Sequence, residues 1–174
     1  MKIYTKMGDE GSTSSLSGKT FRKNDTAIEV IGSADEAITQ IEKCLILLNK
    51  QYDNTYYEIN KDLSKIIEGL YNLMAEVSNG KASGLPKTIQ QGYVKRLERR
   101  IDEITEVLPK QTQFTFFKSE VGIELSEARV RVRKLEREMV QLLRHDIIRP
   151  VLFQYINRLS DYIYIASVFF ENQK

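Results

Sequence analysis

The sequence holds few of the residues on which catalytic and metal sites most often depend, since its 174 residues include one cysteine and one histidine. Cys44 has no second cysteine with which to form an internal disulfide. This fits a reducing compartment, and we interpret Cys44 as a small buried apolar side chain. With His145 alone, the chain offers no plausible zinc site and no histidine-based nucleophilic triad. We therefore assign no metal ligands.

The charges are nearly balanced, with 26 Lys and Arg residues against 24 Asp and Glu residues and a net charge of +2. A balance this even gives no reason to expect a nucleic acid or an acidic membrane surface as a partner. No apolar run approaches the length of a membrane-spanning helix. The N-terminus carries Lys2, Tyr4 and Thr5 where a signal peptide has its apolar core. We expect a cytoplasmic protein.

Five segments repeat apolar residues at steps of three and four, the spacing of helices that bury one face. Segments rich in Gly, Pro and polar residues separate them, and no strand-like alternation follows the first few residues. We predict helices over 34–48, 53–77, 88–108, 119–143 and 150–171. The fold class is therefore all-α, a five-helix bundle with short connections. We predict one domain over 1–174, with an N-terminal segment over 1–25 and the bundle over 28–171.

The first predicted helix begins with a recognisable signal. Ser33 followed by Glu36 has the spacing of a capping box. Asp35 then falls in the first turn, where a carboxylate complements the helix dipole. The same carboxylate is a candidate to orient an arginine.

The fourth predicted helix carries a ladder of guanidinium groups. Arg129, Arg133 and Arg137 recur every four residues and therefore share one helical face, with Glu136 beside them. One interpretation is a solvated face of Arg–Glu pairs that contributes little. The other is an anion site, because the guanidinium fork suits carboxylates and phosphates.

Glycine, hydroxyl and lysine residues gather near the N-terminus. Gly8 and Gly11 allow backbone amides to approach an anion closely, and Lys6, Lys19 and Lys23 add positive charge. The segment lacks the Gly-Lys-Ser/Thr ending of a Walker loop. A flexible N-terminal arm is the alternative interpretation.

The last predicted helix places three polar side chains beside its packing stripe. Asn157, Asp161 and Tyr164 follow one another at steps of four and three. They favour contacts to a ligand or to another helix. A pair between Asp161 and an arginine that fixes helix register is the alternative.

Four motifs in this order resemble one known family. They are Ile3-Tyr-Thr-Lys-Met-Gly-Asp-Glu-Gly-Ser-Thr13, Gly32-Ser-Ala-Asp-Glu36, Ala128-Arg-Val-Arg-Val-Arg-Lys-Leu-Glu-Arg137 and Tyr155-Ile-Asn-Arg-Leu-Ser-Asp-Tyr162. Over nearly its whole length the chain resembles the PduO-type ATP:cob(I)alamin adenosyltransferases. The last motif is the most specific of the four, and the arginine spacing supports it.

The resemblance implies a bundle that trimerises, with ATP and Mg²⁺ bound between subunits. Arg129 would pair with Asp35 across the subunit interface near the corrin, and Arg133 would hold the nucleotide. Phe114 would pack on the lower face of the corrin, with Tyr164 nearby. The other nucleotide-binding residues implied are Thr5, Lys6, Gly8, Asp9, Gly11, Thr13, Ser14, Lys23, Glu136, Arg137 and Asn157.

The resemblance also implies the reaction, which moves the 5′-deoxyadenosyl group of ATP to cob(I)alamin or a related reduced corrinoid and releases triphosphate. A corrinoid reductase and an adenosylcobalamin-dependent enzyme are possible partners. Two departures from the family pattern are Glu10, where the family has Lys, and Phe117-Lys-Ser119 in place of a Pro-Gly-Gly turn. They leave open a non-catalytic paralogue that binds ATP or a corrinoid. A purely structural helical oligomer is a third hypothesis.

Overall fold

The computed structural model describes residues 4, 6, 8–15, 18–52, 56–80, 85, 87–110 and 115–173. All five predicted helices are present, and a small hairpin precedes them. The elements are β1 (Ser12–Ser14), β2 (Thr20–Arg22), α1 (Thr26–Gln51), α2 (Tyr57–Asn79), α3 (Gln91–Glu106), α4 (Glu120–Arg144) and α5 (Pro150–Glu171). Within these residues, no helix is both long enough and apolar enough to span a membrane.

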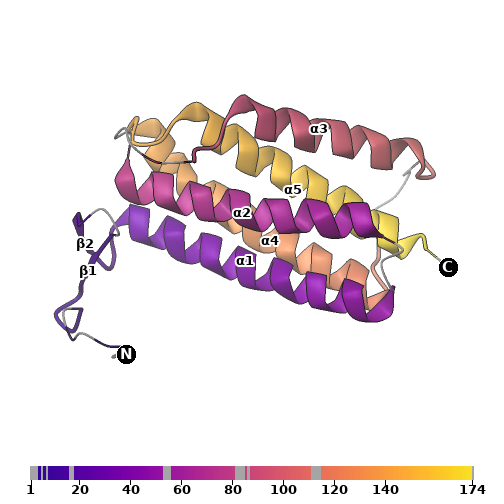
Figure 1. The fold of residues 1–174 in the computed structure, drawn as a ribbon, viewed down its shortest axis with the longest axis horizontal. Helices are drawn as coiled ribbons and strands as arrows, with labels where there is room; N and C mark the ends of the chain where they lie inside the picture. The colour runs from indigo at the N-terminus through magenta and orange to yellow at the C-terminus, as the bar shows by residue number, and fades with distance from the viewer. Residues whose placement is uncertain are drawn as a thin grey trace.

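The helices pack as a bundle in which α4 is central. It contacts both α1 and α5, while α2 packs on α1 and α3 packs on α5 (Figure 1). The apolar stripe predicted for α4 is buried along its full length, including Leu125, Leu135 and Met139. Contact between α2 and α5 is sparse, so side chains of α3 complete that side of the core.

The first helix begins earlier than predicted. It starts at Thr26, and Ser33 is a buried mid-helix residue rather than a cap. Residues before Ser33 continue the apolar period, with Val30 fully buried, so packing extends the helix past the apparent capping box. Asp35 therefore lies in the third turn, and the predicted dipole interaction at the helix start is wrong.

The glycine-rich segment contains a hairpin that the sequence did not predict. β1 and β2 pair antiparallel, with Thr13 opposite Phe21. Strands of three residues are too short to leave a readable alternation. The turns around them use Gly11 and Gly18, both at a φ of 81°. Residues 1–3 and 5 lie outside the described residues.

One carboxylate from the end of α5 joins the start of α4. Glu171 Oε2 accepts hydrogen bonds from the backbone N–H groups of Lys118 and Ser119 and from the Ser119 hydroxyl, each at 2.9 Å. Ser119 is also the N-cap of α4 and accepts from the Gly122 N–H at 3.1 Å. A carboxylate from α5 therefore fixes the segment before α4.

Replacing Glu171 with Gln is expected to lower the free energy of unfolding by about 1 kcal/mol at neutral pH, because a charged acceptor is lost. Although partial burial opposes the effect, hydrogen bonds from the Ser119 and Lys118 backbone lower the pKa of Glu171 below its ordinary value of 4.5. A lowered pKa stabilises the fold above the unfolded-state value and loses that contribution as the pH falls through the native value.

The measurement is urea unfolding of both proteins from pH 7 down to pH 3. We expect the stability difference to narrow below about pH 4.5. The same substitution at Glu106, an exposed residue at the end of α3, is the matched control. A pH-independent difference between wild type and Glu171→Gln would contradict the charged cap.

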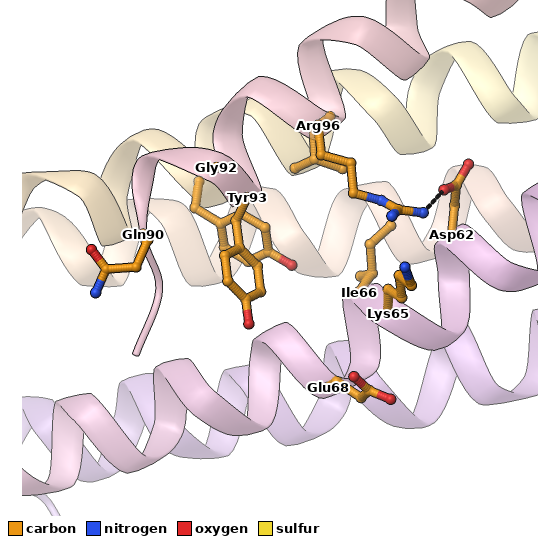
Figure 2. Close-up of a pocket in the computed structure, with 10 residues that line it drawn as sticks. Asp62, Lys65, Ile66, Glu68, Gln90, Gly92, Tyr93 and Arg96 are labelled. Carbon is orange, nitrogen blue, oxygen red and sulfur yellow. Dashed lines mark hydrogen bonds and ion pairs between the residues drawn. The ribbon is translucent and has the colours of Figure 1, made fainter. Parts of the chain in front are cut away.

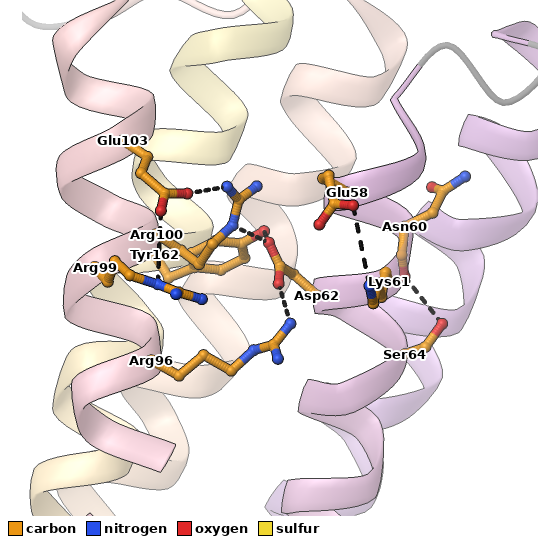
Figure 3. A network of polar contacts seen from close by, with 10 residues as sticks. All are labelled: Glu58, Asn60, Lys61, Asp62, Ser64, Arg96, Arg99, Arg100, Glu103 and Tyr162. Carbon is orange, nitrogen blue, oxygen red and sulfur yellow. Dashed lines mark hydrogen bonds and ion pairs between the residues drawn. The ribbon is translucent and has the colours of Figure 1, made fainter. Parts of the chain in front are cut away.

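A buried ion-pair network joins α3 to α2 and α5. Asp62 of α2 is 2% exposed and accepts from Arg96 at 2.7 Å and from Arg100 at 2.6 Å (Figure 3). The hydroxyl of Tyr162 on α5 donates to the same carboxylate at 3.1 Å. One acidic side chain thus accepts from three donors on two other helices.

Candidate functional site

The face shared by α4 and α5 holds the helical residues of the predicted nucleotide site. The side-chain amide of Asn157 on α5 donates to Glu136 Oε1 on α4 at 2.7 Å. Both residues are half-buried. This hydrogen bond brings together two residues that the sequence placed in one site.

Two members of the arginine ladder are exposed on α4. Arg133 and Arg137 make no hydrogen bond or ion pair with any residue that the structure describes. Glu136, which the solvated-face interpretation would pair with an arginine, is engaged by Asn157 instead. Both guanidinium groups are therefore available to an anion.

The arginine–glutamate pairs of α4 occur on a neighbouring face. Arg131 bonds Glu127 at 2.7 Å and Glu36 of α1 at 3.4 Å. Lys134 bonds the same Glu36 at 3.0 Å, and this hydrogen bond raises the pKa of Lys134. Sequence reasoning missed this α1–α4 link, because the partner is far away in the chain.

The third member of the ladder is partly buried and incompletely satisfied. The guanidinium carbon of Arg129 lies 5.4 Å from the centroid of the Tyr164 ring, a cation–π distance. Its Nε is buried without a hydrogen-bond partner among the described residues. A buried donor in this state is available to a further partner, either ordered water or a group from outside the subunit. Asp35 is exposed and does not pair with Arg129 within the chain, so their pairing across an interface stays a prediction.

Asp161 serves a local role. It accepts from Arg158 of the same helix at 2.9 Å, and Arg158 also bonds Glu98 of α3 at 3.1 Å. The predicted Asp–Arg pair therefore exists within α5 and reaches another helix only through Arg158.

The N-terminal segment brings several predicted residues together. The Lys23 N–H donates to the Gly11 carbonyl at 2.8 Å. A Cβ at Gly8 would lie 3.3 Å from Lys23 Nζ, so the glycine leaves room for the lysine amine. Lys6 adopts a φ of 63° in the adjoining turn. Asp9 is exposed, and Thr13 and Ser14 lie in β1.

Among the described residues, no hydrogen bond or ion pair joins the two halves of the predicted site within one chain. The hairpin projects from the N-terminal end of α1, and none of its described residues bonds Arg133, Arg137 or Asn157 (Figure 1). Thr13 and Ser14 instead border a cavity of about 380 Å³, which Tyr71 and Met74 of α2 also line. Thr5 and Phe114 lie outside the described residues, so the structure leaves their predicted roles untested.

Known proteins resemble this chain along most of its length. The family model described as cobalamin adenosyltransferase matches residues 3–170. The corrinoid adenosyltransferase of Bacillus subtilis is 30% identical over 168 residues, which cover 96% of this chain and 85% of the relative. The PduO corrinoid adenosyltransferase of Salmonella typhimurium is also 30% identical, over 96% of this chain. The chain spans about half of that relative, 49% of its length.

Solved structures agree with these matches. A variant of the PduO-type ATP:corrinoid adenosyltransferase from Lactobacillus reuteri, complexed with cobalamin and ATP, superimposes with a TM-score of 0.86 at 28% identity. The match covers 98% of this chain and 93% of that one. A second variant of the same enzyme, complexed with ATP, gives a TM-score of 0.85 at 28% identity, over 97% of this chain and 94% of that one. The five-helix bundle predicted from sequence is thus confirmed, and the chain belongs to the cobalamin adenosyltransferase family.

Proposed function

We propose that this protein transfers the 5′-deoxyadenosyl group of ATP to the cobalt of cob(I)alamin or a related reduced corrinoid, releasing triphosphate. The observation that carries the proposal is the α4–α5 face, where Arg133 and Arg137 pair with no described residue and lie beside the Glu136–Asn157 hydrogen bond. Family membership supports the same activity, because named relatives are corrinoid adenosyltransferases.

The reaction does not require the protein to supply a general acid or base. Cobalt(I) supplies the electron pair that forms the cobalt–carbon bond, while the bond from C5′ to the triphosphate oxygen breaks and its electrons leave with triphosphate. The chain must hold both partners in line and stabilise charge on the leaving group. Arg133 and Arg137 suit the second task, because guanidinium forks bind phosphate oxygens bidentately. A site without catalytic histidine or cysteine is consistent with this chemistry.

Magnesium would enter this site with the nucleotide. The described residues contain no cluster of three His, Cys, Asp or Glu side chains that would hold a metal. The hydroxyls of Thr13 and Ser14 suit a hard cation already held by phosphate oxygens. The ion would neutralise charge on the departing triphosphate.

We propose that ATP binds between subunits of a homotrimer. The incomplete site supports this, because no hydrogen bond or ion pair between described residues joins the hairpin to the α4–α5 face in one chain. The exposed surface of α4 also suits a protein partner, since Ile123 and Val130 are 51% and 56% exposed one heptad apart. A reductase that supplies cobalt(I) and an enzyme that takes the adenosylated product are the further partners that the reaction requires.

An anaerobic assay with cob(I)alamin and MgATP, followed by the loss of the reduced-cobalt absorbance, tests the activity. Turnover supports the enzyme. Calorimetric binding of ATP without turnover would instead identify a non-catalytic paralogue. Absence of both would leave a structural oligomer.

Replacing Val130 with Glu is expected to convert the trimer to monomers, because a charge buried at a subunit contact is costly. Light scattering after gel filtration measures the mass. The control is Val107→Glu, since Val107 is 70% exposed at the end of α3, away from α4. If the Val130→Glu protein kept the wild-type mass, the prediction that α4 lies in the subunit interface would be wrong.

Replacing Glu10 with Lys is expected to tighten ATP binding about threefold to tenfold, because a cation replaces an exposed anion near the phosphates. Calorimetry with MgATP at low and high salt measures the affinity and its screening. Glu42→Lys, on an exposed position of α1, is the control for net charge. An unchanged or weaker affinity for ATP would contradict the prediction that residue 10 lies near the triphosphate.

A further inference from the structure

A second pocket lies on the other side of α5 from the candidate site. It occupies about 380 Å³ between α2 and α3 and is closed by Tyr155 of α5. It exists because α2 and α5 pack sparsely and α3 completes that side of the core. None of the residues assigned to the nucleotide or the corrinoid lines it. Its volume is in the range of pockets that hold small organic molecules.

The walls suit a flat apolar body. Ile66 of α2 and Leu97 of α3 provide apolar surface. The rings of Tyr93 and Tyr155 lie at 90° with centroids 5.9 Å apart. Aromatic rings favour such edge-to-face arrangements, which leave one ring face free for another planar group.

One end of the pocket carries an exposed lysine as well as an ion pair. Lys65 and Arg96 both line this pocket, and Figure 2 shows the Arg96 guanidinium paired with Asp62. Asp62 accepts from Arg96, Arg100 and Tyr162. Lys65 forms no ion pair with any residue in the described part of the chain. This end can therefore take an added carboxylate.

Tyr155 brings a hydroxyl group to the same pocket. Tyr155 is 2% exposed, and its hydroxyl makes no hydrogen bond with any described residue. Burial raises the pKa of Tyr155, so the group keeps its proton and is able to donate. It lies against Gly69 of α2, where a Cβ would overlap the oxygen. A protonated hydroxyl in this position is able to donate to a polar group of a bound molecule.

We propose that the α2–α3 pocket binds a small aromatic carboxylate. Its carboxylate would lie between Arg96 and Lys65, its ring against Tyr93, and a polar edge within reach of the Tyr155 hydroxyl. Glu68, the other acidic residue of the lining, is exposed, so water screens its repulsion. This binding site is independent of the adenosyl-transfer proposal.

Indole-3-acetate is the probe for this pocket. The chain contains no tryptophan, so indole fluorescence reports the probe alone. We expect saturable binding with a Kd below about 1 mM. Indole-3-acetamide has the same ring without the charge and is expected to bind about tenfold more weakly. Equal affinity for acid and amide, or no binding of the acid up to about 10 mM, would overturn the proposal.

Three variants locate the bound probe. Lys65→Met should weaken the acid about tenfold and leave the amide unchanged, whereas Lys61→Met, one turn earlier on α2, should change neither. Tyr155→Phe should weaken binding about fivefold without lowering the melting temperature. A Cβ at Gly92 meets no atom within 4 Å, so a side chain can start there, and the ring of Gly92→Phe should block the pocket and abolish binding.

Competition separates this pocket from the nucleotide site. Saturating MgATP should leave the affinity for indole-3-acetate unchanged. Displacement by ATP, or undiminished binding to a folded Gly92→Phe protein, would place the probe elsewhere and overturn the assignment. Circular dichroism verifies folding of each variant, so loss of binding is attributed to the pocket only in folded protein.

Discussion

Replacing Arg133 with Ala is expected to lower the turnover of cob(I)alamin and MgATP by about 10²–10³-fold, the usual cost of removing one donor that stabilises developing charge. The side chain is exposed and bonds no other described residue, so its loss removes no hydrogen bond or ion pair between described residues. The melting temperature should therefore stay unchanged. An effect confined to activity distinguishes a functional arginine from a structural one.

The kinetic parameters show when the arginine acts. If it binds the triphosphate mainly as it departs, kcat and kcat/KM should fall together. If it binds ground-state ATP equally well, KM should rise with kcat retained. Arg144→Ala, on the exposed end of the same helix, is the control for a lost charge. Near-wild-type kinetics for Arg133→Ala would favour the interpretation of the arginine ladder as a solvated face.

Arg133→Lys refines the test. A lysine keeps the charge and loses the planar fork, so an intermediate activity is expected if bidentate phosphate contact matters. Full activity of the lysine variant would mean that charge alone suffices. Because the proposed nucleotide site lies between subunits, light scattering is used to verify that each Arg133 variant keeps the wild-type mass.

The helices were predictable because each is long and buries a regular stripe. The α4 stripe from Val121 to Leu142 is buried as its spacing indicates. The start of α1 was not predictable from the sequence. Ser33 and Glu36 have capping-box spacing, but they lie inside a continuous helix. A local signal cannot report that residues before it also pack against the core. The hairpin escaped prediction for a related reason, because Ser12–Ser14 is too short for a period.

The site was only partly predictable for a different reason. Spacing alone placed Arg129, Arg133 and Arg137 on one face. It did not indicate which arginines would form ion pairs. That depends on Glu36 of α1, which engages Arg131, and on Asn157 of α5, which engages Glu136. Such partners are distant in sequence, and a helical period does not encode them.

The burial of Asp62 is the clearest feature of the fold that could not be predicted from the sequence. This residue lies in a polar stretch of α2 that gives no sign of burial. Its position is inside the bundle because Arg96 and Arg100 reach it from α3. The ion pairs join α3 to a helix with which it has few backbone contacts. Replacing Asp62 is therefore expected to lower stability considerably, although no sequence motif marks this residue.

Replacing Asp62 with Ala is expected to lower the free energy of unfolding by about 3 kcal/mol, because buried donors lose their shared acceptor. The cost is at the lower end for a broken buried pair, since Arg96 retains 31% side-chain exposure and can turn to water. Arg100 also keeps its bond to Glu103. For a chain of this size the loss corresponds to about 6–12 °C in melting temperature.

The remaining donors make the prediction specific. Burial and the neighbouring Asp62 raise the pKa of Tyr162, so its hydroxyl stays protonated and loses its acceptor in the variant. Tyr162→Phe alone should cost only about 1 kcal/mol. In the Asp62→Ala background the same change should cost less, because the hydroxyl no longer has an acceptor to lose.

Glu58→Ala is the matched control for Asp62→Ala. Glu58 lies one turn earlier on α2 and forms a 4.0 Å exposed pair with Lys61, so its removal should change stability by less than about 0.5 kcal/mol. Urea unfolding of the single and double variants measures these differences. If Asp62→Ala and Glu58→Ala proved equally mild, water would be satisfying Arg96 and Arg100, and the network would not hold α3 in place.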